Sequence, residues 1–192
     1  KYARGLICLA MDTTQSNKLG LTLASPINQS RSKTAFTYSI EAKKGVTTGI
    51  SAYDRSRTIN VASKKNANKN DIVSPGHVFP VIAKDGGVLV RAGHTEAAVD
   101  ISRLAGLNPS GVICEIMNDD GTMARLPDLM KFAKEHNLNV ATIADLISYR
   151  RRRDKLVNKV AEKNIDTLSG GEFKMAVYGS TIENTEHIAL VK

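Results

Sequence analysis

The sequence predicts an α+β protein of the α/β type: a three-layer arrangement in which helices pack on a mixed β-sheet. Short apolar runs typical of strands alternate irregularly with amphipathic segments typical of helices. Apolar residues make up 42% and charged residues 24% of the 192 residues, which is an ordinary globular composition. No internal repeat is visible, and no apolar run approaches the ~20 residues that a membrane-spanning helix needs.

The first strands are predicted from apolar patterning. Residues 4–10 form an apolar run typical of a buried strand. Residues 34–41 alternate between apolar and polar side chains, which predicts a strand with one apolar face. Residues 12–33 and 63–74 are rich in Ser, Asn or Lys, and we expect loops there.

Glycine and proline mark the middle of the chain. Pro75 and Gly76 predict a turn into a strand that ends at Pro80. Residues 86–90 predict a tight turn followed by a strand, and residues 111–117 predict another strand.

Four segments carry signals for a helix start. Ser51 with Asp54 resembles a capping box, and Thr95 is a candidate N-cap for a helix that ends before Gly106. The last helix could continue through the arginines to Lys163. The predicted starts are Ser51, Thr95, Pro127 and Thr142. Beyond them, residues 173–178 and 186–191 read as two strands of a hairpin.

The net charge of +8 leaves two kinds of partner open. A basic nucleic-acid module is one reading, and residues 150–153 (four arginines) could serve it. Aromatic residues are only 5% and Trp is absent, which argues against a stacking platform for single strands. A basic pocket for a phosphorylated metabolite fits the charge equally well. Cys8 and Cys114 lie in apolar runs and are read as buried side chains in a reducing compartment.

The densest polar cluster is residues 91–96, which follow a predicted strand and open a helix. A helix start offers free N–H groups to a phosphate, and Arg91 can pair with it through two hydrogen bonds. Gly93 allows close approach, Thr95 can cap the helix or bind the ligand, and His94 is a candidate metal ligand. The competing interpretation is a structural strand–helix corner.

Glu115 and His77 are the next candidates. Glu115 interrupts an apolar strand, where a carboxylate is costly unless it faces a site. Burial would raise its pKa and suit it to proton transfer. His77 gains weight beside these residues, because ligand sites gather at the carboxyl ends of strands in α/β sheets. The alternatives are a solvent-facing glutamate and a structural histidine.

Four motifs in this order closely resemble the 3,4-dihydroxy-2-butanone 4-phosphate synthase family of riboflavin biosynthesis, over about residues 3–150. They are TTGISAYDR at 47–55, PGHVFP at 75–80, RAGHTEA at 91–97 and GVICE at 111–115. The resemblance implies a lyase that converts ribulose 5-phosphate into 3,4-dihydroxy-2-butanone 4-phosphate and formate.

The resemblance also assigns roles to residues. It implies that His77 and Glu115 are catalytic and that His94 ligates one of two divalent ions per site, Mg²⁺ or Mn²⁺. The substrate-binding residues that it implies are Arg91, Ala92, Gly93, His94, Thr95 and Glu115. It further implies a homodimer in the cytoplasm, or in the plastid of a plant, with no membrane partner, and we expect no nucleic-acid partner.

The resemblance divides the chain at residue 150. Residues 1–149 correspond to the synthase domain, and residues 150–192 resemble the linker and first strands of a GTP cyclohydrolase II domain in bifunctional proteins. The family carries an acidic segment before the first of these motifs, whose glutamate bridges the metals. The sequence begins at Lys1 without that segment, so we expect this exact chain to lack synthase activity.

Overall fold

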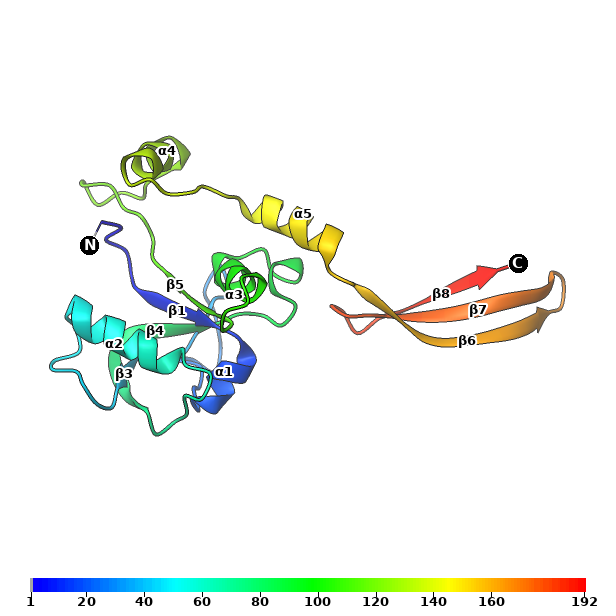
Figure 1. Cartoon of the computed structure of the whole chain (residues 1–192), viewed down its shortest axis with the longest axis horizontal. Helices are drawn as coiled ribbons and strands as arrows, with labels where there is room; N and C mark the ends of the chain where they lie inside the picture. Colours follow the sequence, from blue (N-terminus) through cyan, green and yellow to red (C-terminus); the bar gives the residue numbers. More distant parts are fainter. Residues whose placement is uncertain (1) are drawn as a thin grey trace. The chain divides into compact units, whose positions relative to one another are not determined.

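A computed structural model describes residues 2–192, and the described chain divides into two compact units. The first unit ends at Ile143 and holds a mixed sheet with its helices, and the second spans Ala144–Lys192 (Figure 1). None of the helices within residues 2–192 is long and apolar enough to cross a membrane.

The first unit is built on a mixed sheet, as the sequence predicts. At its centre β1 (Cys8–Met11) runs parallel to β4 (Ile72–Ile82). The other neighbour of β1 is the antiparallel strand β5 (Ser110–Ile113). Strands β2 (Ala35–Phe36) and β3 (Ile40–Ala42) both pair antiparallel with β4. The predicted mixed α+β fold is therefore confirmed.

Helices cover both faces of this sheet. The helical elements of the first unit are α1 (Thr13–Lys18), α2 (Ala52–Ala62), the 3₁₀ turn η1 (Gly87–Leu89), α3 (His94–Leu104) and α4 (Leu126–Glu135). On β1, Leu9 and Met11 belong to the core cluster that contains Ala62 of α2, whereas Cys8 and Ala10 pack with Val99 of α3. Successive strand residues point to opposite faces, so α2 and α3 cover opposite faces and make three layers (Figure 1).

The helix starts follow the predicted signals with two differences. Ser51 Oγ accepts a hydrogen bond from Asp54 N (3.0 Å) at the start of α2, and α4 begins at Leu126 with proline in its first turn. The cap of α3 is Gly93, one residue before the helix, and Thr95 already lies inside it. Helix α1 lies in a region where we expected a loop, because the carboxylate of Asp12 accepts from Gln15 N (2.8 Å) and caps it.

Four strand predictions are wrong in detail. β5 ends at Ile113, although we expected that strand to reach residue 117. β4 runs through both prolines, since Pro80 still offers its carbonyl, which accepts from Thr37 N (3.0 Å). The predicted strand at 34–41 is split into β2 and β3, because Thr37 turns inward and is buried. Residues 87–89 form the 3₁₀ turn η1, with Val88 N bonded to the Asp100 carboxylate (2.8 Å), and not a strand.

The second unit contains the helix α5, except for its first residue, Ile143. It also contains an antiparallel sheet with the strand order β6-β7-β8. Its elements are α5 (Ile143–Arg153), β6 (Val157–Thr167), β7 (Gly171–Ser180) and β8 (Glu186–Val191). β7 and β8 confirm the two predicted strands. The helix does not continue to Lys163, because residues from Val157 onward pair with β7 instead.

Candidate active site

A pocket of about 550 Å³ lies where α3 begins and β5 ends. His94, the first residue of α3, and Glu115, two residues beyond β5, both line it. Apolar side chains such as Ile113 and Leu129 supply much of the remaining wall. Two residues that the sequence singled out separately therefore meet at one pocket of a size that suits a small molecule.

Glu115 is held by the start of the chain. Its Oε2 accepts a hydrogen bond from Leu6 N (3.0 Å), and its carbonyl accepts from Gly5 N (3.1 Å). A Cβ on Gly5 would lie 2.5 Å from the Glu115 carbonyl oxygen and 2.6 Å from its Oε2, so this contact needs glycine. The residue is exposed because β5 ends before it, so the structure agrees with the alternative of a solvent-facing glutamate and not with a buried carboxylate.

The Cys8 thiol lies close to this carboxylate but is unsuited to chemistry. Burial, and to a smaller extent the nearby Glu115 and Cys114, raise the pKa of Cys8 to about 11. A thiol with such a pKa is almost wholly protonated near neutral pH. Cys8 is thus a buried core side chain, as the sequence indicated.

Arg91 is engaged in contacts within the protein. Its Nη1 donates to Glu96 Oε2 (2.5 Å), and its Nη2 donates to the Ser32 carbonyl (2.9 Å) and to Thr34 Oγ1 (3.2 Å). The Glu96 side chain is 0% exposed and also accepts from Lys84 N (2.9 Å). Most of the arginine charge is thus compensated by a buried carboxylate. Arg91 is not among the residues that line the pocket of His94 and Glu115.

The start of α3 keeps its backbone N–H groups available. Within the described residues, no side chain caps this helix start, which follows Gly93 and Ala92. A Cβ on Gly93 would lie 2.4 Å from Arg91 Nη1 and 2.5 Å from Glu96 Oε2, so glycine makes room for the ion pair. Thr95 is buried. Free N–H groups at a helix start are suited to an anion.

His77 lies inside β4, not after a strand end as we expected, and it forms a pair with Glu41 of β3. His77 Nδ1 lies 2.5 Å from Glu41 Oε1. β1 lies between β4 and β5, so His77 of β4 and Glu115, two residues beyond β5, belong to segments on opposite sides of β1. At a strand spacing of ~4.8 Å, the backbones of β4 and β5 are roughly 10 Å apart. His77 is not among the residues that line the pocket of His94 and Glu115.

The sequence reasoning missed Glu41. It placed this residue on the polar face of a strand, and no local signal marked it as a partner of His77. The contact depends on the antiparallel pairing of β3 with β4, which includes a register shift between Ile40 and Glu41.

Asp54 fixes the loop that precedes α2. Its buried carboxylate accepts from Thr47 Oγ1 (2.7 Å), from Thr47 N (3.2 Å) and from Gly49 N (2.9 Å). The hydrogen bond from the Thr47 hydroxyl, followed by those from the backbone and Ser51, lowers the pKa of Asp54 below its ordinary value. The role of Asp54 in this structure is to hold residues 47–49.

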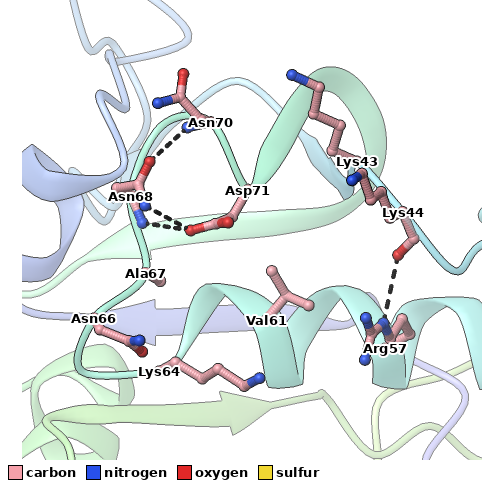
Figure 2. Close-up of a pocket in the computed structure, with 10 residues that line it drawn as sticks. All are labelled: Lys43, Lys44, Arg57, Val61, Lys64, Asn66, Ala67, Asn68, Asn70 and Asp71. Carbon is pink, nitrogen blue, oxygen red and sulfur yellow. Dashed lines mark hydrogen bonds between the residues drawn. The ribbon is translucent and has the colours of Figure 1, made fainter.

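A second pocket, of about 440 Å³, is strongly basic (Figure 2). Its cationic lining residues are Lys43, Lys44, Arg57 and Lys64. The one carboxylate in the lining, that of Asp71, accepts from Asn68 N and Asn68 Nδ2 (both 2.9 Å). None of the residues that the sequence analysis identified as catalytic or ligand-binding lines this second pocket. Its lysines and arginine account for part of the net positive charge of the chain.

The donors for a divalent cation are incomplete in the described chain. Within residues 2–192, no group of three or more His, Cys, Asp or Glu side chains is close enough to hold a metal ion. His94 and Glu115 offer one imidazole and one carboxylate around their pocket. Mg²⁺ sites commonly use one or two carboxylates together with water and substrate oxygens, so these residues fit part of such a site.

The fold and this pocket define a three-layer α+β protein with a pocket of small-molecule size beside the end of β5. A family model described as 3,4-dihydroxy-2-butanone 4-phosphate synthase matches residues 1–149. The chain is 53% identical over 190 residues to the 3,4-dihydroxy-2-butanone 4-phosphate synthase of Pseudomonas aeruginosa, covering 99% of this chain and 52% of that protein. It is 56% identical over 192 residues to the riboflavin biosynthesis protein RibBA of Aquifex aeolicus, covering 99% of this chain and 47% of that protein. The chain belongs to the 3,4-dihydroxy-2-butanone 4-phosphate synthase family.

Solved structures agree with this assignment. The two-domain 3,4-dihydroxy-2-butanone 4-phosphate synthase RibBX from A. baumannii matches with a TM-score of 0.87 and 45% identity, over 100% of this chain and 56% of that chain. A 3,4-dihydroxy-2-butanone 4-phosphate synthase in complex with two magnesium ions matches with a TM-score of 0.77 and 36% identity, over 80% of this chain and 76% of that chain. The chain spans about half the length of the curated relatives that it matches.

Proposed function

We propose that this chain forms the catalytic part of a lyase that converts D-ribulose 5-phosphate into 3,4-dihydroxy-2-butanone 4-phosphate and formate. The observation that carries the proposal is the meeting of His94 and Glu115 at one pocket. Both residues lie in motifs of the family to which the chain belongs. An imidazole and a carboxylate beside a small-molecule pocket are groups suited to moving protons on a sugar phosphate.

The phosphate would bind at the start of α3. His94 and Thr95 present N–H groups at the start of the helix, after Gly93, and the helix dipole favours an anion there. Arg91 contributes less charge than its sequence position suggests, because Glu96 neutralises it. It would act mainly by holding the loop that carries Ala92 and Gly93 in place.

Glu115 and His77 would transfer protons. Glu115 projects from the end of β5 toward the pocket and is exposed enough to exchange protons with substrate. His77 lies on β4, on the other side of β1. Two groups on either side of one strand can serve different steps of an enolisation and a later protonation.

His94 would be a ligand of a divalent cation, and we propose two such ions per site, Mg²⁺ or Mn²⁺. A cation bound there would acidify the C–H bond beside the substrate carbonyl and stabilise negative charge on the substrate oxygens. The magnesium-bound relative supports this proposal.

The organisation of the whole protein is also a proposal. We keep the predicted division into a synthase domain, 1–149, and the start of a cyclohydrolase II-like domain, 150–192, in a cytoplasmic homodimer. The two-domain relative, which matches the whole of this chain, supports the division, and the bacterial relatives support the location. Exposed apolar residues on α3, such as Ile101 and Leu104, are available to a dimer interface. Light scattering at micromolar concentration tests the dimer, and a monomer would contradict it.

Steady-state kinetics of the native gene product test the activity. Formate should be released from ribulose 5-phosphate with Mg²⁺ and not with a chelator. Glu115→Gln should lower kcat by about 10²-fold with little change in KM, because the amide keeps the shape but cannot accept a proton. Glu183→Gln, an exposed residue of the second unit, is the matched control and should leave both constants unchanged. Failure of the native protein to release formate would overturn the proposal.

A further inference from the structure

The contact between His77 and Glu41 has a geometry that selects one ring nitrogen. His77 Nδ1 lies 2.5 Å from Glu41 Oε1. An ionised carboxylate can only accept hydrogen bonds, so Nδ1 carries the proton. In the neutral imidazole, Nε2 is then the unprotonated nitrogen. The Glu41 side chain is only 16% exposed, whereas the His77 side chain is 43% exposed and accessible to a ligand.

Two glycines make room for Glu41. A Cβ on Gly49 would lie 1.5 Å from Glu41 Oε1, which is an impossible contact. A Cβ on Gly76, beside His77, would lie 2.5 Å from Glu41 N and 2.2 Å from the Ile40 carbonyl oxygen. The backbone therefore encloses Glu41 on two sides and limits where its carboxylate can lie.

The backbone of Gly49, which contacts Glu41, is itself held in place. Gly49 has a φ of +88°, which glycine adopts without strain. The Gly49 N–H, the Thr47 N–H and the Thr47 hydroxyl all donate to the buried carboxylate of Asp54, which lies in the first turn of α2. A continuous set of contacts thus runs from α2 through the 47–49 loop to Glu41 and then to His77.

We propose that Glu41 is a positioning residue that fixes the orientation and the tautomer of His77, so that Nε2 is the nitrogen available to take a proton. The proposal rests on the proposed function in one respect, that His77 transfers a proton to or from the substrate. An outer residue that orients an imidazole typically changes activity by about 10- to 100-fold when it is replaced.

The first test uses Glu41→Gln in the native gene product, with two readouts. The amide of Gln can donate or accept, so it no longer forces the proton onto Nδ1. We expect kcat to fall by about 10- to 100-fold with little change in KM. We also expect the ¹⁵N spectrum of His77, assigned by its loss in His77→Gln and recorded where the ring is neutral, to shift toward the other tautomer.

The second test displaces the Glu41 carboxylate by adding a methyl group to the neighbouring backbone at Gly49. Gly49→Ala places a methyl group on the carboxylate, whereas Gly106→Ala, at a φ of +73° with nothing within 4 Å of its Cβ, imposes only the backbone strain. Gly49→Ala should lower kcat as Glu41→Gln does, and Gly106→Ala should retain the native kcat.

The outcomes separate this proposal from the proposed function. An unchanged His77 tautomer in Glu41→Gln, or a kcat within 2-fold of the native value, would overturn the positioning role. A native protein that releases no formate would overturn the proposed function instead, and the ¹⁵N spectra would still report whether Glu41 sets the tautomer.

Discussion

The ion pair between Arg91 and Glu96 should make Arg91→Ala strongly destabilising. The Glu96 side chain is 0% exposed, and Arg91, at 24% exposed, is its cationic partner at 2.5 Å. After the substitution, the hydrogen bond from Lys84 N (2.9 Å) remains to the buried carboxylate. Removing one partner of a buried pair costs about 3–5 kcal/mol. The partial exposure of Arg91 admits water, so we expect the lower end of that range.

Urea unfolding, followed by circular dichroism, measures this loss. A second variant, Glu96→Gln, and the double variant complete a thermodynamic cycle. The double variant leaves no buried charge, so it should be more stable than the sum of the single losses predicts, with a coupling of about 1–3 kcal/mol. The slope of the free energy with urea should stay constant if only the native state changes.

Arg103→Ala is the matched control. Arg103 is 53% exposed, and its nearest carboxylate oxygens lie 3.6 Å away on Asp12 and 4.0 Å away on Asp100. Asp100 is buried and Asp12 is 17% exposed, but both distances are long and the guanidinium is in contact with water, so we expect these pairs to be worth about 0–1 kcal/mol. If Arg91→Ala cost no more than Arg103→Ala, or if the coupling with Glu96→Gln were zero, the reasoning about the buried pair would be refuted.

Two further predictions concern titration. Hydrogen bonds lower the pKa of Asp54 below its ordinary value of 3.8, so its ionised form stabilises the fold above that pH, and the contribution is lost as the pH falls through the lowered value. Asp54→Asn should therefore be less stable than the native chain at pH 7, with a smaller difference at pH 3, as measured by urea unfolding at the two pH values. For Cys8, 4% exposed and with a pKa raised to about 11, about 1 thiol in 10³ is ionised at pH 8. Iodoacetamide should modify it only after unfolding, as read by mass spectrometry, and rapid labelling of the native chain would contradict the burial.

Much of the proposed site could be located from the sequence. The motif at 91–97 marks a helix start, and α3 begins at His94. Glu115 was identified because a carboxylate within an apolar run is costly to bury unless it faces a site. In the structure it lines a pocket together with His94. These signals are local, since they depend on residue type and on neighbours within a few positions.

The roles of the charged side chains within that site could not be predicted in this way. The sequence suggested that Arg91 is free to bind phosphate, but Arg91 forms an ion pair with Glu96, 5 residues later, which compensates its charge. Glu41 and His77 are 36 positions apart and meet only because β3 pairs with β4. Such contacts depend on strand register, which no short stretch of sequence encodes.

The sequence by itself determined the alternation of strands and helices, the cap of α2 at Ser51 and the apolar strand β1. Local hydrogen bonds and hydrophobic periodicity act within a few residues and can be read directly. The tertiary structure alone decided that β4 continues through Pro75 and Pro80, that residues 87–89 form a 3₁₀ turn and that β6 replaces the end of the last helix. In each case the deciding partner lies elsewhere in the chain: the strands β3 and β1 for β4, the Asp100 carboxylate for the 3₁₀ turn and the strand β7 for β6. Backbone groups must be paired when they are buried, and that requirement overrides local propensity.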